Sequence, residues 1–500
     1  MAQKKSIKKN APRPLRLSVE FVITMEKKNV APLRDIYQRR KTHEVRVGNT
    51  PLGGTNPIRV QSMTTTSTMD TDACVAQTLR IVEAGGEYVR LTTQGDREAK
   101  NLESIGRKLR ELGCNVPLVA DVHFNAHVAD VAALYAQKVR INPGNYVDPA
   151  RKFQKIDYTD AEYADEIAKI EQRFVPFLRI CREHGTAIRI GVNHGSLSDR
   201  IMSRYGDTPE GMVESCMEFL RICQREQFPD VVISIKASNT VVMVRTVRLL
   251  VQQMDCEGMD FPLHLGVTEA GEGEDGRVKS AVGIGALLCE GIGDTIRVSL
   301  SEAPEREIPV ARKMVESIEE CAALRAKIRE SIEQDEILVE FAENDWESLQ
   351  LKAAMTVGAL LIDGLAHRLT IRDPHFSQEK LNELADSILQ AARVKMTKPE
   401  FISCPGCGRT LYDLEETIAR IKSAVLARAE QNPAFRTLKI GIMGCIVNGP
   451  GEMADADYGY VGAAAGKVSL YKRKECIERN IPADQAVDRL LQFIEEDLRK

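Results

Sequence analysis

The run VVISIKASN, residues 231–239, decides the fold, because it is one of eight similar segments that follow one another along the chain. Each is a short apolar stretch rich in β-branched residues, and helical-looking segments such as DACVAQTLRIVEAGG (72–86) separate them. The other seven are PIRVQSM (57–63), EYVRLTT (87–93), VPLVADVHF (116–124), KVRINPGN (138–145), AIRIGVN (187–193), FPLHLGVTEAG (261–271) and TIRVSLSEAP (295–304). Eight alternations of strand and helix patterns predict an α/β protein with a (β/α)8 TIM barrel over residues 41–315.

Polar side chains gather at the C-terminal ends of these runs. In a TIM barrel those ends converge on one mouth, where active sites form. Arginine forks match phosphate oxygens, and amide and hydroxyl groups add hydrogen bonds, so the pattern predicts a pocket for a phosphorylated anion. Any one of these residues alone fits a loop salt bridge equally well. The set is Arg90, Asp121, His123, Arg140, Asn142, Arg189, Asn193, Lys236, Ser238, Thr268, Glu269, Arg297 and Ser299.

Three cysteines near the C-terminus form a second chemical signal. Cys404 and Cys407 lie in FISCPGCGRTLYDL (401–414), and Cys445 lies in GIMGCIVNGPGEMADADYG (441–459), 38 positions after Cys407. Pro-Gly turns expose backbone N–H groups toward sulfur, and such thiolates bind soft metals or iron–sulfur clusters. The pattern favours a cluster.

Two alternatives for the thiols stay open. A structural zinc site needs four closed ligands, and no second CxxC or HxxxH follows Cys445, although Cys476 in the polar, helical-looking segment YKRKECIERN (471–480) supplies another thiol. The second alternative is that the three cysteines are core residues that bind no metal.

Length and composition limit the class of protein. A chain of 500 residues is long enough for two or three domains, and a net charge of −4 gives no support for nucleic-acid binding. Twelve cysteines without even spacing are typical of a reducing compartment, which predicts a cytoplasmic location. No apolar run approaches the roughly 18 residues of a membrane span.

Residues 1–40 are predicted to form a basic N-terminal arm. Residues 1–19 contain six Lys and Arg and no acid, which suits a transit peptide. A disordered arm, or an upstream start with Met25 as the natural initiator, is the favoured interpretation.

An internal repeat follows the barrel. VKSAVGIGALLCEGIGDTIRVSL, from Val278, is echoed by LKAAMTVGALLIDGLAHRLTIRD, from Leu351, at a constant offset of 73. We interpret residues 316–398 as an insert that is a remnant of a second barrel-like element, with chance similarity as the alternative. Residues 399–500 are predicted to form a compact last domain that holds the cysteines.

From about Arg46 onward the chain resembles the 4-hydroxy-3-methylbut-2-enyl diphosphate synthase family of the methylerythritol phosphate route to isoprenoids. The resemblance rests on ordered motifs, among them VQSMTTT, VRLTTQG, PLVADVHF, RIGVNHGSL, HLGVTEAGEG, EGIGDTIRVSL, SCPGCGRT and GCIVNGPGE. It implies a TIM barrel joined to a small sulfite/nitrite-reductase-like α+β domain with a 4Fe-4S cluster. By the family's motif, the cluster ligands are Cys404, Cys407, Cys445 and Glu452.

The resemblance also implies an assembly and partners. It implies a homodimer in which one chain's cluster domain covers the other chain's barrel, with ferredoxin or flavodoxin as electron donor. One branch of the family joins the two domains almost directly, and another inserts a complete second barrel-like domain. The insert of about 83 residues here matches neither.

The family's reaction opens 2-C-methyl-D-erythritol 2,4-cyclodiphosphate and removes a hydroxyl with two electrons. The resemblance then implies that the strand-end cations and amides hold the cyclic diphosphate. Glu269 is the predicted proton donor, a role that needs a carboxyl with a raised pKa, and Glu452 is the predicted labile iron ligand. His123 and His264 are weaker candidates, because each is equally well a structural histidine.

Two other classes are weighed against this interpretation. A pterin-binding barrel transferase would share the anion pocket but leave the Cys/Glu set idle. A zinc-ribbon binding module would use the thiols but leave the barrel mouth unexplained. Radical S-adenosylmethionine chemistry is disfavoured because CxxxCxxC is absent.

Overall fold

The computed structural model describes residues 37–123, 125–148, 156–446, 451 and 455–499, which all lie in one compact unit, Arg34–Lys500. Most of the predicted basic arm is outside these residues, as is Glu452. The described end of the arm contacts the barrel, because Arg39 pairs with Asp294 at 2.5 Å and Arg40 with Asp255 at 2.7 Å.

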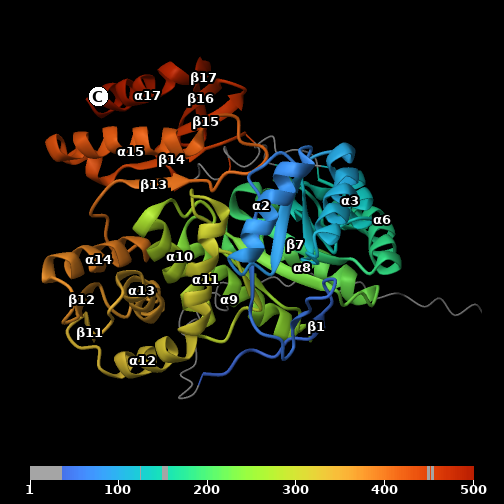
Figure 1. Cartoon of the computed structure of the whole chain (residues 1–500), viewed down its shortest axis with the longest axis horizontal. Helices are drawn as coiled ribbons and strands as arrows, with labels where there is room; N and C mark the ends of the chain where they lie inside the picture. Colours follow the sequence, from blue (N-terminus) through green and yellow to red (C-terminus); the bar gives the residue numbers. More distant parts are fainter. Residues whose placement is uncertain (1–36, 124, 149–155, 447–450, 452–454, 500) are drawn as a thin grey trace, which may run out of the picture. The chain divides into compact units, whose positions relative to one another are not determined.

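Eight parallel strands form the barrel predicted from the sequence (Figure 1). They are hydrogen-bonded in the order β8-β7-β6-β5-β4-β3-β10-β9, and a parallel bridge between Ile233 and Leu263 joins the two ends of this sheet into a ring. The TIM-barrel prediction is therefore confirmed. The strands are β3 (Arg59–Met63), β4 (Tyr88–Thr93), β5 (Leu118–Val122), β6 (Lys138–Ile141), β7 (Ala187–Asn193), β8 (Val231–Lys236), β9 (His264–Leu265) and β10 (Thr295–Ile296).

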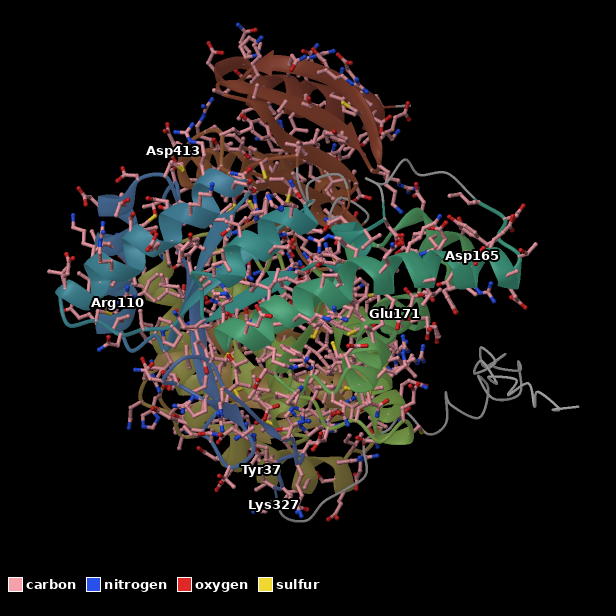
Figure 2. All side chains as sticks on the ribbon, turned by 90° about the vertical axis from the view of Figure 1, so that its right-hand side faces the viewer. Tyr37, Arg110, Asp165, Glu171, Lys327 and Asp413 are labelled. Carbon is pink, nitrogen blue, oxygen red and sulfur yellow. The ribbon has the colours of Figure 1, made fainter. Side chains whose placement is uncertain are left out.

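Amphipathic helices follow the strands and cover the barrel. In α3, for example, Ala99, Leu102, Ile105 and Leu109 are buried at helical spacing. Charged side chains such as Arg110 and Asp165 lie on the exposed side of their helices (Figure 2). The helices are α2 (Thr71–Glu83), α3 (Asp96–Glu111), α4 (Ala126–Ala133), α5 (Pro143–Tyr146), α6 (Asp160–His184), α7 (Asp199–Tyr205), α8 (Pro209–Arg225), α9 (Thr240–Cys256), α10 (Gly273–Leu288) and α11 (Glu307–Glu316).

The N-terminal end of the barrel is closed by a short hairpin of β1 (Glu44–Val45) and β2 (Leu52–Gly53). Its apolar side chains Val45 and Leu52 pack in one buried cluster with Tyr88 of β4 and Val232 of β8. This apolar plug leaves the C-terminal mouth as the end where polar strand residues can meet a ligand.

The segment after the barrel forms a small α/β insert. It contains α12 (Ile318–Glu330), β11 (Glu336–Glu340), α13 (Trp346–Ile362), β12 (Arg368–Arg372) and α14 (Gln378–Ala391), and β11 pairs with β12 in parallel. The helix of the second repeat copy, α13, starts 73 residues after α10, the offset found in the sequence. The insert thus holds one strand–helix–strand unit that matches β9–α10–β10.

The two repeat copies pack against each other reciprocally. A methyl group on Gly285 of α10 would overlap Met355 of α13, and a methyl group on Gly358 of α13 would lie 3.1 Å from the Cα of Val282 of α10. Gly285 and Gly358 are equivalent positions, as are Val282 and Met355. Such exchange of contacts is typical of two-fold symmetry.

Arg248 of α9 joins the two copies at their equivalent carboxylates. Its guanidinium contacts Glu290 at 2.6 Å and Asp363 at 2.6 Å, and these residues are also 73 positions apart. All three side chains are nearly buried. Removing the arginine would leave Asp363 without a cation among the described residues and Glu290 with Arg325 alone, at 3.4 Å.

We expect Arg248→Met to destabilise the protein by about 3–5 kcal/mol, because breaking a buried ion pair leaves uncompensated charge. Thermal unfolding of the purified protein should show a clearly lower melting temperature. Arg245→Met is the matched control, since Arg245 lies one turn away on the same helix and is exposed, so its effect should stay within about 0.5 kcal/mol. Equal melting temperatures for the two variants would contradict the role of Arg248.

The last domain is a five-stranded sheet with helices. Its strands lie in the order β13-β14-β15-β16-β17, with the first three parallel and the last two antiparallel. The elements are β13 (Glu400–Ser403), α15 (Leu414–Gln431), β14 (Lys439–Met443), β15 (Tyr458–Ala464), β16 (Lys467–Lys472), β17 (Glu475–Pro482) and α17 (Ala483–Leu498). α15 and α17 pack on it through a shared apolar core.

The helical interpretation of residues 471–480 is wrong. Cys476 lies in β17, opposite Tyr471 of β16 in an antiparallel hairpin. In the described part of the chain, no helix is long and apolar enough to cross a membrane.

Candidate active site

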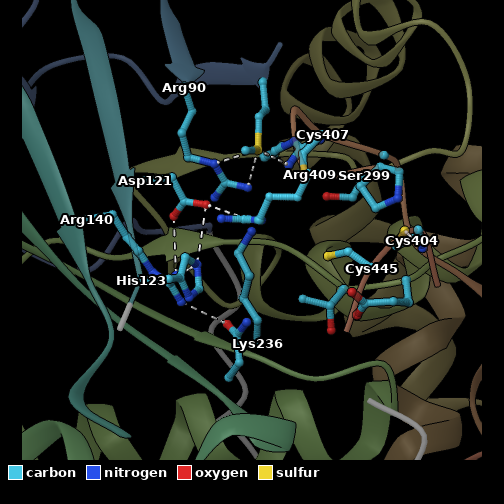
Figure 3. A pocket seen from close by; sticks show the side chains of 18 of the residues that line it. Arg90, Asp121, His123, Arg140, Lys236, Ser299, Cys404, Cys407, Arg409 and Cys445 are labelled. Atoms are coloured by element: carbon cyan, nitrogen blue, oxygen red, sulfur yellow. Dashed lines mark hydrogen bonds and ion pairs between the residues drawn. The ribbon is translucent and has the colours of Figure 1, made fainter. Parts of the chain in front are cut away.

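One cavity is lined by residues of the barrel mouth and of the last domain (Figure 3). Its barrel side contains most of the predicted strand-end residues, and its other side contains the three predicted cysteines. The predicted residues that line it are Arg90, Asp121, His123, Arg140, Arg189, Asn193, Lys236, Thr268, Glu269, Arg297, Ser299, Cys404, Cys407 and Cys445.

Neighbouring strands bring the cations together. Asp121 of β5 is aligned with Arg140 of β6, which is aligned with Arg189 of β7. Glycines leave room for the long side chains: a Cβ on Gly191 would lie 2.5 Å from Arg140 Nε, and one on Gly266 would lie 2.7 Å from Lys236 Nζ. The barrel interior is therefore shaped around its basic residues.

The cavity carries excess positive charge. Six cationic and two carboxylate side chains are among the described residues that line it. Arg297 is held at 3.1 Å by the buried Glu307, but Arg90, Arg189 and Lys236 form no ion pair with any described carboxylate. Burial lowers the pKa of Arg189 and Lys236 well below their usual values, and the neighbouring Arg90 lowers both further. Buried unpaired cations are costly, so the cavity suits a multiply charged anion.

Asp121 is the acceptor at the centre of the cations. Its carboxylate lies 3.3 Å from Arg140, 3.4 Å from Arg409 and 3.5 Å from His123. Burial alone would raise the pKa of Asp121, but Arg90, His123 and Arg140 hold it well below the usual value. Burial, assisted by Arg140, lowers the pKa of His123 to about 3. At neutral pH Asp121 is thus ionised and His123 is neutral.

Glu269 lies at the mouth in an unusual backbone conformation. Its φ is +49°, in the left-handed region that non-glycine residues rarely adopt, and its side chain is buried in the cavity lining. Such strain is found mainly where a side chain must be aimed at a functional site. Glu269 is also close enough to Cys404 for its charge to act on that thiol.

The thiols face the cavity from two loops tied together by backbone hydrogen bonds. Gly444 N–H donates to Cys404 Sγ at 3.2 Å, and Leu411 N–H donates to the Gly444 carbonyl at 3.1 Å. Burial raises the pKa of Cys404 to about 12. Cys404, Cys407 and Cys445 all line the cavity, so the three sulfurs lie near one another.

Three predicted residues do not line the cavity. Asn142 accepts from Gly144 N–H and donates to Ser196 Oγ at 2.8 Å, so it stabilises the turn after β6. Ser238 Oγ donates to Asp455 of the last domain at 3.3 Å. His264 is buried inside the barrel beside Thr295, and burial lowers its pKa well below the usual value.

Sequence reasoning missed Arg409, Met63 and Ser234, which also line the cavity. Met63 sulfur lies 2.9 Å from Arg90 Nη2, and Ser234 belongs to β8. Arg409 follows the CxxC pair by two positions, and a basic side chain so close to two thiols was the signal available in the sequence.

The cysteines and the barrel mouth that share this cavity belong to one chain. Besides the contact of Arg409 with Asp121, Ser301 Oγ lies 2.8 Å from Ser403 Oγ, and Lys474 lies 3.4 Å from Asp207. The resemblance implied closure by the other chain of a homodimer. In the structure, the chain's own last domain covers its barrel, and closure by a second chain stays a prediction.

These features define a class of protein: a TIM-barrel enzyme with a strongly cationic mouth, closed by a domain that presents three thiols. Family comparison agrees. The family model of the GcpE TIM-barrel domain matches residues 42–312, and the model of the GcpE protein C-terminal domain matches residues 400–496. The chain therefore belongs to this family.

Similar proteins include two named 4-hydroxy-3-methylbut-2-en-1-yl diphosphate synthase (flavodoxin). The protein from Bacteroides thetaiotaomicron is 51% identical over 612 aligned positions, which cover 93% of this chain and 99% of the relative. That from Phocaeicola vulgatus is 51% identical, over 92% of this chain and 98% of the relative. Because the alignment exceeds the 500 residues of this chain, the first relative carries a long segment without a counterpart here.

A solved structure, the N-acetylneuraminic acid (sialic acid) synthetase from Leptospira borgpetersenii, is 10% identical with a TM-score of 0.36. The match covers 57% of this chain and 91% of the synthetase chain. This likeness is too weak to bear on function.

Proposed function

We propose that this protein is a 4-hydroxy-3-methylbut-2-en-1-yl diphosphate synthase of isoprenoid biosynthesis. It would open 2-C-methyl-D-erythritol 2,4-cyclodiphosphate and release one hydroxyl as water, taking up two electrons and two protons, to form the linear allylic diphosphate. The observation that carries the proposal is a single cavity lined by a cationic barrel mouth on one side and three thiols on the other.

The thiols fit a 4Fe-4S cluster as ligands. We propose that Cys404, Cys407, Cys445 and Glu452 hold it, with Glu452 outside the described residues. No group of three or more His, Cys, Asp or Glu among the described residues is arranged to hold a metal ion. A four-iron cluster does not require such a group, because each protein ligand binds a different iron. When bound, the cluster supplies single electrons and a Lewis-acidic iron.

The barrel side would bind the diphosphate. Arg90, Arg189 and Lys236 have no carboxylate partner among the described residues, so the substrate's phosphates would supply their counter-charge. Arg297 is held by Glu307, and Arg140 donates to Asp121 from Nη1 and to the Gly191 carbonyl from Nη2, so these two cations are already partnered. Because Asp121 is ionised, its role toward the diphosphate is to hold the neighbouring arginines rather than to bind phosphate itself.

The remaining roles follow from position. Glu269, aimed into the cavity from a strained backbone, would protonate the oxygen that leaves as the C–O bond breaks. Asn193, Thr268 and Ser299 would donate hydrogen bonds to substrate oxygens. Neutral His123 would orient Arg140.

The partners are proposed on other grounds. The names of the two relatives favour flavodoxin over ferredoxin as electron donor. The homodimer implied by the family resemblance stays a prediction. We place the protein in the cytoplasm, because twelve cysteines without even spacing are typical of a reducing compartment.

The proposal is tested by anaerobic isolation followed by assay with the cyclic diphosphate and reduced flavodoxin. We expect a brown protein with about four iron and four sulfide per chain, and product detected by mass spectrometry. Stoichiometric zinc without iron, or iron without product formation, would overturn the proposal.

A further inference from the structure

Arg409 stands apart from the other cations of the cavity. Arg90, Arg140, Arg189, Lys236 and Arg297 come from barrel strands or their ends, whereas Arg409 lies in the thiol-bearing loop of the last domain. It is only 8% exposed. Figure 3 shows its side chain reaching from the cysteines toward Asp121. Among the described residues it is the one cation that crosses from the last domain into the barrel mouth.

The loop that carries Arg409 is packed tightly on the barrel. A Cβ on Gly408 would lie 2.7 Å from the carbonyl oxygen of Thr66, and Gly406 has a φ of +75°. Only glycine fits such a close approach without displacing backbone. The loop therefore brings the guanidinium into the mouth together with Cys407.

The contacts of Arg409 leave half of its guanidinium unused. Nη2 lies 3.4 Å from Asp121 Oδ2, a long hydrogen bond, and Nη1 is buried without a hydrogen-bond partner among the described residues. Asp121 is shared, because its other oxygen accepts from Arg140 at 3.3 Å. A buried N–H group without a partner is costly and indicates a missing acceptor.

We propose that Arg409 is a positioning residue that binds the substrate's diphosphate with Nη1 while Asp121 holds Nη2. The bound anion would then tie the thiol-bearing loop to the barrel, so that substrate binding sets the position of the cysteines over the reacting carbon. Asp121 acts as the counter-ion that keeps Arg409 and Arg140 in place. This inference rests on the proposed function, because it takes the diphosphate as the ligand.

Arg409→Gln removes a charge-assisted contact, so inorganic diphosphate should bind about 10-fold or more weakly. Calorimetric titration of the anaerobically purified holoprotein with inorganic diphosphate measures the affinity. Unchanged affinity in Arg409→Gln would overturn the proposal.

Hydrogen exchange tests the tie between the domains. Diphosphate should slow amide exchange in residues 404–412 of the unaltered protein, because the anion holds this loop on the barrel. Arg409→Gln should lose this protection even at saturating diphosphate, and Arg409→Lys, which keeps the charge but not the fork, should recover part of the affinity. Protection that persists in Arg409→Gln would show that the loop is held without Arg409.

Two further variants separate this inference from the proposed function. Arg428→Met is the matched control, since Arg428 pairs with Glu495 elsewhere in the same domain, and its affinity for diphosphate should be unchanged. If Arg428→Met also lowers the affinity for diphosphate, removing an arginine far from the cavity is enough to weaken binding. That result would contradict the specific role of Arg409. Arg189→Ala should also weaken binding about 10-fold. If Arg189→Ala weakens binding but Arg409→Gln does not, only the inference fails; if neither does, the barrel mouth is not a diphosphate site and the proposed function fails.

Discussion

Serine in place of Cys404, Cys407 or Cys445 is expected to abolish turnover and remove most of the iron from the isolated protein. The three thiols line one cavity from two loops, and Cys404 accepts a backbone N–H from Gly444. A serine hydroxyl is a poor ligand for iron, because it does not ionise readily and is harder than thiolate. Iron and sulfide analysis, with the visible absorption spectrum, measures the loss.

Cys476→Ser is the control for this experiment. Cys476 lies in β17 and is not among the residues that line the cavity, although it packs against the same small apolar cluster as Cys404. We expect this variant to keep its iron and its activity. If Cys476→Ser loses as much iron as the other three, Cys476 and not Glu452 is the fourth ligand.

The barrel could be predicted because its signal is repeated eight times. A single apolar run such as AIRIGVN is ambiguous between strand and helix, but regular alternation with amphipathic segments leaves one architecture. The same regularity predicted the cavity. The parallel strands of a closed barrel bring equivalent positions together, so Arg90, Arg140 and Arg189, each the third residue of its strand, meet in one cavity although they are far apart in the sequence.

Local geometry explains the strand-end residues that do not line the cavity. Asn142 and Ser238 lie one and two positions beyond the ends of β6 and β8, where the chain has already turned toward a helix or the last domain. His264 lies too early on its strand and points into the barrel interior. His123 and Arg297 also lie one position beyond their strands and line the cavity, so the hydrogen bonds of each turn, and not the distance from the strand end, decide which side chains reach it.

Contacts between distant segments could not be predicted. The segment around Cys476 is rich in Lys, Arg and Glu, which favour helix, but pairing with β16 makes it an edge strand, where charged residues are common. Arg409 belongs to the cavity only because its loop packs on the turn after β3. The residues of neither segment indicate which distant segment it packs against.

Glutamine in place of Glu269 is expected to lower kcat by about 100-fold or more while the substrate still binds. Glu269 lines the cavity beside Thr268 and is close enough to Cys404 for its charge to act on that thiol. Glutamine preserves shape and hydrogen bonding but has no carboxyl proton to give, and loss of a general acid typically costs 10²–10⁴-fold. The steady-state rate, compared with the dissociation constant of the cyclic diphosphate, separates loss of proton transfer from loss of binding.

Glu452→Gln is the informative comparison, because the two glutamates are proposed to do different work. Glu269→Gln should leave the electron paramagnetic resonance spectrum of the substrate-free reduced protein unchanged, since Glu269 is not a proposed iron ligand. Glu452→Gln should alter that spectrum, because it replaces the proposed oxygen ligand of one iron. The opposite pattern, with the resting spectrum altered by Glu269→Gln and untouched by Glu452→Gln, would exchange the two roles. The proton for C–O cleavage would then have to come from another group at the mouth.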